Sequence, residues 1–250
     1  NSMKKIAYAN AVADDKVRRF VPPVRVVRES AGVSDSAALL DGVHTQSFVH
    51  FNPRECVLPP GGEIILDFGL ELHGLLTVTT GCMKLSRARI TFGESVSETL
   101  GTPTQDHAIH QELLSLPQLG QVNFGQTAFR FVRLEIPADA PEVRLIGVVA
   151  TAIYRDWEYR GTFLSDDERL NRIWEVGAYT VHLNCQDYIY DGVKRDRLVW
   201  MGDLYPEIRT ILAAFDETAL VEKSLDFVRD HTPDDKWMNT ASSYSCWWVI

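Results

Sequence analysis

The stretch from Asp191 to Glu207, DGVKRDRLVWMGDLYPE, contains the residue types from which an acid–base site can be built. Its four carboxylic acids and three basic residues lie among large apolar side chains such as Trp200 and Met201. Carboxyl groups that lie close together away from water have separated pKa values, so that one can donate a proton while another accepts one. We therefore predict that this stretch lines a sugar pocket. A solvated loop of structural ion pairs is the alternative.

The candidate catalytic residues are Asp191, Asp196, Asp203 and Glu207. If one helix ran through Asp196, Asp203 and Glu207, their spacings of seven and four would place them near one face. Arg195 can keep a neighbouring carboxylate ionised by pairing with it. Glycoside hydrolysis needs one protonated and one ionised carboxyl group on opposite sides of the scissile bond. In the alternative interpretation, the three basic residues only neutralise the acids.

The totals are those of a globular protein, with 45% hydrophobic and 24% charged residues in a chain of 250. This length has room for roughly two domains. The net charge of −9 argues against nucleic acid and against an anionic membrane as partners. No apolar run approaches the roughly 20 residues that a membrane-spanning helix needs. The oligomeric state is open, with a homodimer as one expectation.

The four cysteines are far apart and form no CxxC pair, so we expect no structural zinc site and no cofactor. A cluster of His107, His110, Asp106 and Glu112 could be a metal site, but a polar connecting loop is our interpretation. The first twenty residues lack the apolar segment of a secretory signal. With Met3 as the native start we expect a cytoplasmic protein, an inference that fails if a signal peptide has been removed.

Residues 24–159 have the pattern of short β-strands, because apolar and β-branched runs alternate with glycines and polar turns. The runs are Ile64–Phe68, Leu75–Thr80, Ala88–Phe92, Phe129–Ile136 and Leu145–Tyr154. We predict an antiparallel, jelly-roll-like β-sandwich over residues 1–160. Residues 28–45 and 94–125 are less regular, and the second of these is expected to be a connecting loop.

The period changes at Gly161, where a helical domain over residues 161–250 is predicted to begin. Ser165 and Glu168 have the spacing of a capping box. One face of the following helix carries Leu170, Ile173, Trp174, Gly177, Ala178 and Val181.

A second helix is predicted from Gly202 to Phe215, and a third from Glu217 to His231 with Asp216 as its cap. The sequence closes on an apolar run, Cys246–Ile250. From this we expect the natural protein to be longer.

The stretch DGVKRDRLVWMGD resembles the signature of the α-L-rhamnosidases of glycoside hydrolase family 78, in which an Asp, an Arg, an acid, a Trp and an Asp after Gly follow in this order. Upstream, ILDFGLELHGLLTV, ITFGESVSE, FRFVRLEI and GTFLSDDERLNRIWEV are similar to the β-sandwich that precedes the catalytic barrel in that family. The resemblance covers residues 62–207.

The resemblance implies a mixed, multi-domain fold: a β-sandwich followed by the first helices of an (α/α)6 barrel. It also implies an inverting mechanism on terminal α-L-rhamnosyl residues, with a carbohydrate as the partner. Asp191, Arg195, Trp200 and Asp203 would contact the rhamnose, and Asp196 would be the proton donor. Many members carry Glu in that stretch, and Glu207 is an alternative donor. Trp248 is a further candidate for sugar contact, or else a core residue.

The family's general base is a Glu farther along the barrel, to which no residue here can be matched. Two other functions stay open on the sequence. One is a non-catalytic carbohydrate-binding or structural module. The other is a different helical-barrel enzyme, such as another exo-glycosidase or a polysaccharide lyase.

Overall fold

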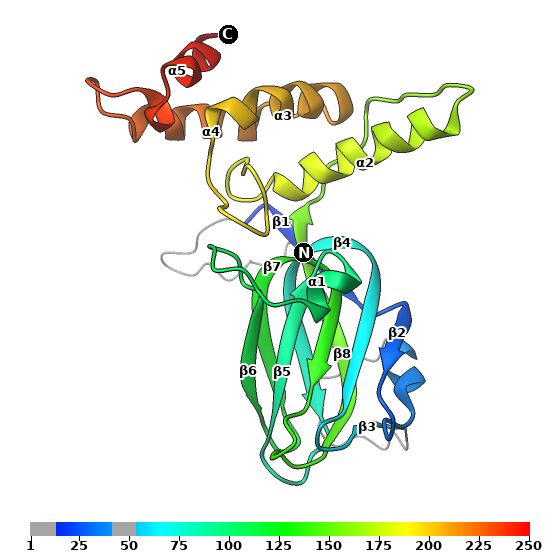
Figure 1. Ribbon diagram of the computed structural model, residues 1–250. Helices are drawn as coiled ribbons and strands as arrows, with labels where there is room; N and C mark the ends of the chain where they lie inside the picture. Colours follow the sequence, from blue (N-terminus) through cyan, green and yellow to red (C-terminus); the bar gives the residue numbers. More distant parts are fainter. Residues whose placement is uncertain (1–13, 42–53) are drawn as a thin grey trace, which may run out of the picture.

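The computed structural model describes residues 14–41 and 54–250, so the predicted chain start and part of the irregular 28–45 segment lie outside it. The described chain has two parts, a β-sheet part that ends at Arg155 and a helical part that begins at Glu168. The helices stack over one end of the strands (Figure 1). The predicted fold class, a β-sandwich followed by helices, is confirmed. The exact division at residues 160 and 161 stays a prediction.

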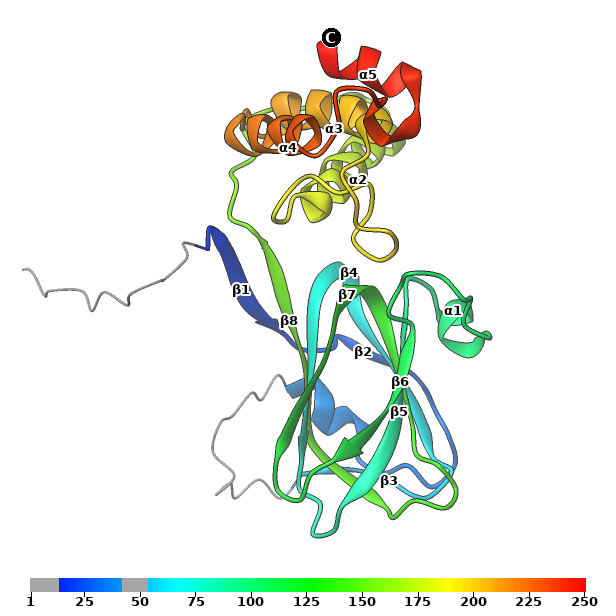
Figure 2. The same ribbon diagram turned by 90° about the vertical axis from the view of Figure 1, so that its left-hand side faces the viewer.

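All strand pairs in the described residues are antiparallel, in the order β1-β8-β4-β7-β5-β6, with β2 added on β4 and β3 on β8. The strands are β1 Lys16–Val21, β2 Arg25–Glu29, β3 Cys56–Leu58, β4 Glu63–Thr80, β5 Ser86–Gly93, β6 Gln111–Leu116, β7 Gln121–Glu135 and β8 Val143–Arg155. The long strands β4 and β7 reach the end of the sandwich that faces the helices (Figure 2).

Strand β4 pairs with β7 along both of its halves, but its neighbour on the other side changes half-way along. Its first half pairs with β2 up to Asp67, and its second half pairs with β8 from Gly74 onward. Between them Gly69 has φ +89°, a left-handed conformation that glycine adopts without steric cost. The sheet therefore folds over a single core, in which the ring of Phe92 lies 4.6 Å from that of Phe129 and 5.2 Å from that of Phe124.

The prediction that residues 94–125 form a connecting loop was wrong. This segment contains the short helix α1 Val96–Leu100, the strand β6 and the start of β7. Strand β6 lies at the edge of the sheet, and its outer residues are exposed. It therefore carries few of the alternating apolar residues by which strands are recognised.

The helical part contains α2 Glu168–Asn184, α3 Met201–Ala214, α4 Ala219–Asp230 and α5 Ser242–Val249. Short 3-10 helices occur at Ser36–Asp41 in the β part and at Met238–Thr240 before α5. Two predicted caps were wrong. The carboxylate of Asp167, rather than Ser165, accepts from the N–H of Arg169 at the start of α2, and α4 begins after Thr218 rather than after Asp216.

The apolar face predicted for α2 is only partly buried. Ala178 packs with Ala214 and Phe215, whereas Leu170 and Ile173 are 46% and 58% exposed. Asn171 and His182, at spacings of seven and four residues from Ala178, are buried on the same side as Ala178. His182 bonds to the main-chain oxygen of Arg155 at the end of β8, and Asn184 bonds to Glu207 of α3. Periodicity identifies the residues that share a face, but it does not show which neighbour covers that face.

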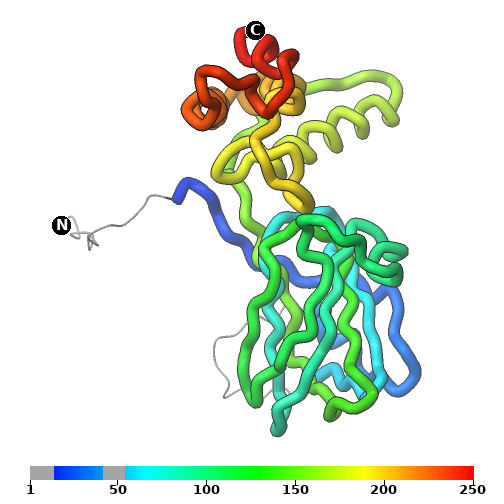
Figure 3. Tube along the Cα trace, turned by 60° about the vertical axis from the view of Figure 1, so that its left-hand side comes forward, coloured from blue at the N-terminus to red at the C-terminus, as the bar shows by residue number. Residues whose placement is uncertain are grey.

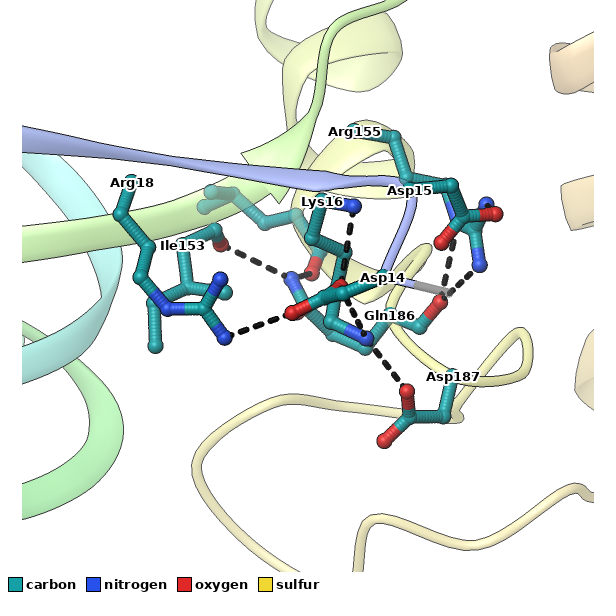
Figure 4. A network of polar contacts seen from close by, with 9 residues as sticks. Asp14, Asp15, Lys16, Arg18, Ile153, Arg155, Gln186 and Asp187 are labelled. Carbon is teal, nitrogen blue, oxygen red and sulfur yellow. Dashed lines mark hydrogen bonds and ion pairs between the residues drawn. The ribbon is translucent and has the colours of Figure 1, made fainter. Parts of the chain in front are cut away.

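The two parts meet at the end of β8 (Figure 4). Two guanidinium nitrogens of Arg155 donate to the main-chain oxygen of Gln186, over 2.9 and 2.6 Å. Arg155 also pairs with Asp15, and Lys16 of β1 pairs with Asp187. The amide of Gln186 donates back to the oxygen of Ile153. Because Arg155 and Gln186 are both buried, these bonds hold the end of α2 firmly against the sheet.

Among the described residues, no helix combines the length and the apolar character needed to cross a membrane.

Candidate active site

A cavity of about 870 Å³ lies between the helical part and the near end of the sandwich. Three of the predicted site residues line it: Asp191, Arg195 and Asp196. They belong to the segment between α2 and α3, which descends toward the strands before the chain turns back into α3 (Figures 2 and 3). The first part of the acidic stretch, residues 191–196, therefore faces a hollow, whereas Trp200, Asp203 and Glu207 are not among the residues that line it.

The loop from Asp191 to Leu198 is closed at its base. The N–H of Asp191 donates to the oxygen of Leu198, and the N–H of Leu198 donates to Oδ1 of Asp191, each over 2.9 Å. Within the loop, Asp196 and Arg197 have φ values of 57° and 56°, in the left-handed region. Such conformations cost roughly 1 kcal/mol or more per residue and persist only where the surroundings impose them.

The basic residues of the loop do more than neutralise its acids. Arg195 pairs with Asp196 over 3.5 Å, but the other two reach the sandwich. Lys194 pairs with Glu98 of α1, and Arg197 donates to the oxygen of Gln126 over 3.2 Å. Gln126 is the extra residue of a β-bulge in β7, with φ 121°. The loop is therefore held against the sandwich from two sides.

The pKa of Asp191 is raised. Burial of the carboxyl group is the main cause, and the negative charges of Asp196 and Asp203 add to it, while the hydrogen bond from Leu198 opposes it. A carboxyl group among like charges in a cavity is the environment in which acid and base roles can separate.

The predicted common helical face of three acids is not found. Helix α3 begins at Met201, so Asp196 lies in the loop before it. On the helix, Asp203 is exposed and Glu207 is buried. Trp200 precedes the helix, and its ring meets that of Tyr244 edge to face, with centroids 6.1 Å apart. The left-handed residues of the loop are the physical reason, because they interrupt any helix there.

Glu207 lies behind the cavity wall rather than in it. Its Oε1 accepts from the side-chain amide of Asn184 over 2.8 Å, and Asn184 lines the cavity. Burial raises the pKa of Glu207 to about 8, with smaller contributions from Asp203 and Asp191. Its Oε2 is buried without a hydrogen-bond partner among the described residues.

Replacing Glu207 with glutamine is expected to stabilise the protein at alkaline pH. Between the ordinary pKa of 4.5 and the folded value of about 8, the folded chain holds a proton that the unfolded chain has released. Stability must therefore fall as the pH rises through this interval. Since glutamine has no proton to lose, the free energy of unfolding of the variant should exceed that of the parent by roughly 1–3 kcal/mol at pH 8.5.

Urea denaturation at pH 5 and pH 8.5 measures this difference. The matched control is Glu158→Gln, at an exposed acid. Equal pH dependence in the parent and in Glu207→Gln would contradict the assignment of a buried, protonated Glu207.

Trp248 is not among the residues lining the cavity. Its indole N–H donates to the main-chain oxygen of Leu225 over 3.1 Å, and its ring packs on the core of the helical part. The neighbouring Trp247 lies against Tyr205, with ring centroids 4.4 Å apart. Both tryptophans therefore stabilise the contact of α5 with the other helices.

The sandwich contributes cavity residues that the sequence did not single out as site residues. Glu71, Glu94 and Glu98 line the cavity on the sandwich side, together with Asp106 and His110. Burial raises the pKa of Glu71 to about 8, and the charge of Glu94 adds to this while Lys194 opposes it. The sequence did contain a signal for the start of the helix that carries Glu98, because Ser95 and Glu98 have the spacing of a capping box.

The four residues considered as a metal site, His107, His110, Asp106 and Glu112, do not all come together in the fold. His110 bonds to Asp106 through Nε2 over 2.9 Å, whereas Glu112 is exposed on β6. Within residues 14–41 and 54–250, no three His, Cys, Asp or Glu side chains are placed to hold a metal ion.

Comparison with known proteins shows what the chain resembles. Residues 158–249 match a family model described as the bacterial alpha-L-rhamnosidase 6 hairpin glycosidase domain. Among solved structures, a rhamnosidase from Klebsiella oxytoca with rhamnose bound is similar with a TM-score of 0.71 and 23% identity, over 94% of this chain and 51% of that one. No match was found among curated protein sequences.

Two further structures are similar over most of this chain. A GH78 family rhamnosidase of Bacillus sp. GL1 has a TM-score of 0.65 and 19% identity, over 85% of this chain and 23% of that one. An alpha-L-rhamnosidase of Streptomyces avermitilis complexed with L-rhamnose has a TM-score of 0.56 and 19% identity, over 72% and 19%. The chain thus spans about half the length of the Klebsiella protein and less of the other two.

Proposed function

Starting from the confirmed resemblance of this chain to the α-L-rhamnosidases, we propose that it belongs to a glycoside hydrolase that releases terminal α-L-rhamnosyl residues. The observation that carries the proposal is the cavity between the two parts, into which the loop brings Asp191, Arg195 and Asp196. Ionisable groups gathered in a hollow are what acid–base chemistry requires. The rhamnose in the Klebsiella and Streptomyces structures supports a carbohydrate as the substrate.

In this proposal Asp196 is the general acid. It lines the cavity, and Arg195 lies beside its carboxyl group. Asp191 and Arg195, which line the same cavity, contact the sugar. For Trp200 and Asp203, which do not line it, the sugar contact rests on the resemblance alone. Trp248 does not contact the sugar in this proposal, because its N–H donates to the oxygen of Leu225 and its ring packs against the helical core.

The proposed reaction inverts the anomeric centre. An inverting enzyme places a water molecule between the sugar and a second carboxylate, which acts as the general base. We place that base in a part of the protein outside this sequence, since the chain covers only 51% of the Klebsiella structure. The chain alone would then bind the glycoside but turn it over poorly. A cytoplasmic location remains an expectation.

The test is an assay of the complete gene product on an aryl α-L-rhamnoside, with the released sugar followed by proton NMR. Inversion predicts that β-L-rhamnose appears first and then mutarotates. Initial release of α-L-rhamnose would exclude the inverting mechanism. Hydrolysis of another aryl glycoside with the rhamnoside untouched would assign a different exo-glycosidase, and an unsaturated, ultraviolet-absorbing product would assign a lyase.

A further inference from the structure

We infer that Glu98 of the sandwich is a positioning residue for the proposed general acid, acting through Lys194 of the loop. The inference rests on the proposed function for its catalytic part. It gives the sandwich a direct part in the site, because α1 holds the loop that carries Asp196 through the pair between Glu98 and Lys194.

Glu98 is itself held in place by the local structure of α1. Its N–H donates to the hydroxyl of Ser95 over 3.2 Å, and its Oε2 accepts from the N–H of Glu94 over 2.7 Å. This reciprocal capping arrangement occupies one carboxylate oxygen and leaves Oε1 directed at Lys194. These bonds within residues 94–98 therefore restrict the conformation of the Glu98 side chain independently of its contact with the loop.

Lys194 depends on this partner. The residue is 8% exposed, and its neighbour Val193 packs with Leu183 of α2 and Ala128 of β7. A buried ammonium group without a paired carboxylate is strongly unfavourable. Among the described residues, Glu98 is the only ion-pair partner of Lys194.

Glu98 carries the charge that this role requires. Burial acts to raise its pKa, but the hydrogen bonds from Lys194 and from the N–H of Glu94 outweigh burial and lower the pKa. His110 lies 3.8 Å from Oε1 through Nδ1, and its Nε2 is bound to Asp106. Both oxygens of Asp106 accept further bonds, from the N–H of Ala108 and the hydroxyl of Thr104.

The position of Lys194 in the loop makes it an effective anchor. It stands three residues after Asp191 and two before Asp196, inside a loop whose base is closed between Asp191 and Leu198. Arg197 is held separately by the oxygen of Gln126. A general acid must lie within hydrogen-bond reach of the leaving oxygen, and a displacement of about 1 Å can cost about a hundred-fold in rate.

The first readout is independent of catalysis. In the complete gene product, Glu98→Gln is expected to release the loop, so that trypsin cleaves after Lys194, Arg195 or Arg197 about ten times faster than in the parent. Mass spectrometry of the peptides identifies the sites. Glu112→Gln, at an exposed acid of the same sandwich, is the matched control and should leave these rates unchanged. Ser95→Ala loosens Glu98 without changing a charge and serves as the second variant should Glu98→Gln fail to fold.

The second readout is the dependence of kcat on the leaving group. With Asp196 displaced, kcat should fall by about ten-fold or more for alkyl or weakly acidic aryl rhamnosides and far less for dinitrophenyl rhamnoside, with a smaller change in KM. General loosening of the fold would lower kcat equally for all leaving groups.

Unchanged cleavage of the loop would overturn the anchoring by Glu98. Faster cleavage with unchanged kcat on a rhamnoside that the parent hydrolyses would overturn the positioning of Asp196. If the parent hydrolyses no rhamnoside, the proposed function fails, and the trypsin result still decides whether Glu98 holds the loop.

Discussion

Asp196→Asn in the complete gene product is expected to lower kcat on an alkyl α-L-rhamnoside by about 10²–10⁴-fold, the usual contribution of a general acid. Asparagine matches aspartate in size and tolerates the left-handed conformation found at this position, where φ is 57°. The substitution therefore removes the transferable proton while keeping the shape of the loop. Steady-state kinetics measure the loss.

The identity of the leaving group separates acid catalysis from a general loss of activity. A dinitrophenolate leaves without protonation, so its rhamnoside should lose far less activity in Asp196→Asn than an alkyl rhamnoside. Asp166→Asn, at an exposed acid before α2, is the matched control and should behave as the parent does. An equal loss on both substrates would assign Asp196 to binding, and no loss on either would remove it from the site. Asp191, whose pKa is raised by burial, would then be the next candidate for the acid.

Gly161→Ala is expected to lower the free energy of unfolding of the helical part by about 2–4 kcal/mol. A Cβ added at Gly161 would lie 1.7 Å from the main-chain oxygen of Ala213, a backbone atom that cannot move by itself. The N–H groups of Arg160 and Gly161 both donate to the oxygen of Ala214, over 2.9 and 3.1 Å. Any displacement that makes room for the methyl group must break these bonds to the end of α3.

Gly177→Ala is the matched control for that substitution. Gly177 is in the middle of α2, and a Cβ there would meet no atom within 4 Å. Alanine at such a helical position should raise stability by about 0.5–1 kcal/mol. Thermal and urea unfolding of the two variants should therefore shift in opposite directions. A shift in the same direction would show that the approach of Gly161 to Ala213 is not a constraint in solution.

Much of the fold follows from local pattern. The runs Ile64–Phe68 and Leu75–Thr80 appear as the two halves of β4, and the helix predicted from Gly202 to Phe215 appears as α3 Met201–Ala214. The two strand runs are apolar or β-branched and buried almost throughout, and α3 buries Met201, Leu204, Ile211 and Ala214 at helical spacing. Apolar runs and helical periodicity both reveal such segments. The edge strand β6 has few buried apolar residues, and α1 is only five residues long with Thr99 as its buried residue, so neither shows such a pattern.

The site was predictable only in part for the same reason. The cluster of acids and bases around Asp196 is a local feature that is visible in the sequence. That Lys194 would pair with Glu98, almost a hundred residues earlier, depends on how the sandwich and the helical part meet. Asp196 and Arg197 adopt the left-handed conformation although neither is a glycine, so the sequence gives no sign that a helix is interrupted there.

The bulge at Gln126 has a consequence for chimeric enzymes. One additional residue in β7 turns its carbonyl toward Arg197, and the capped turn at Ser95 aims Glu98 at Lys194. A sandwich without the capped turn and the bulge would present neither group to the DGVKRDR segment, and shortening β7 by one residue would remove the contact of Gln126 with Arg197. Domain exchange among such proteins should therefore succeed when the bulge, the capped turn and the acidic segment are transferred as a single unit.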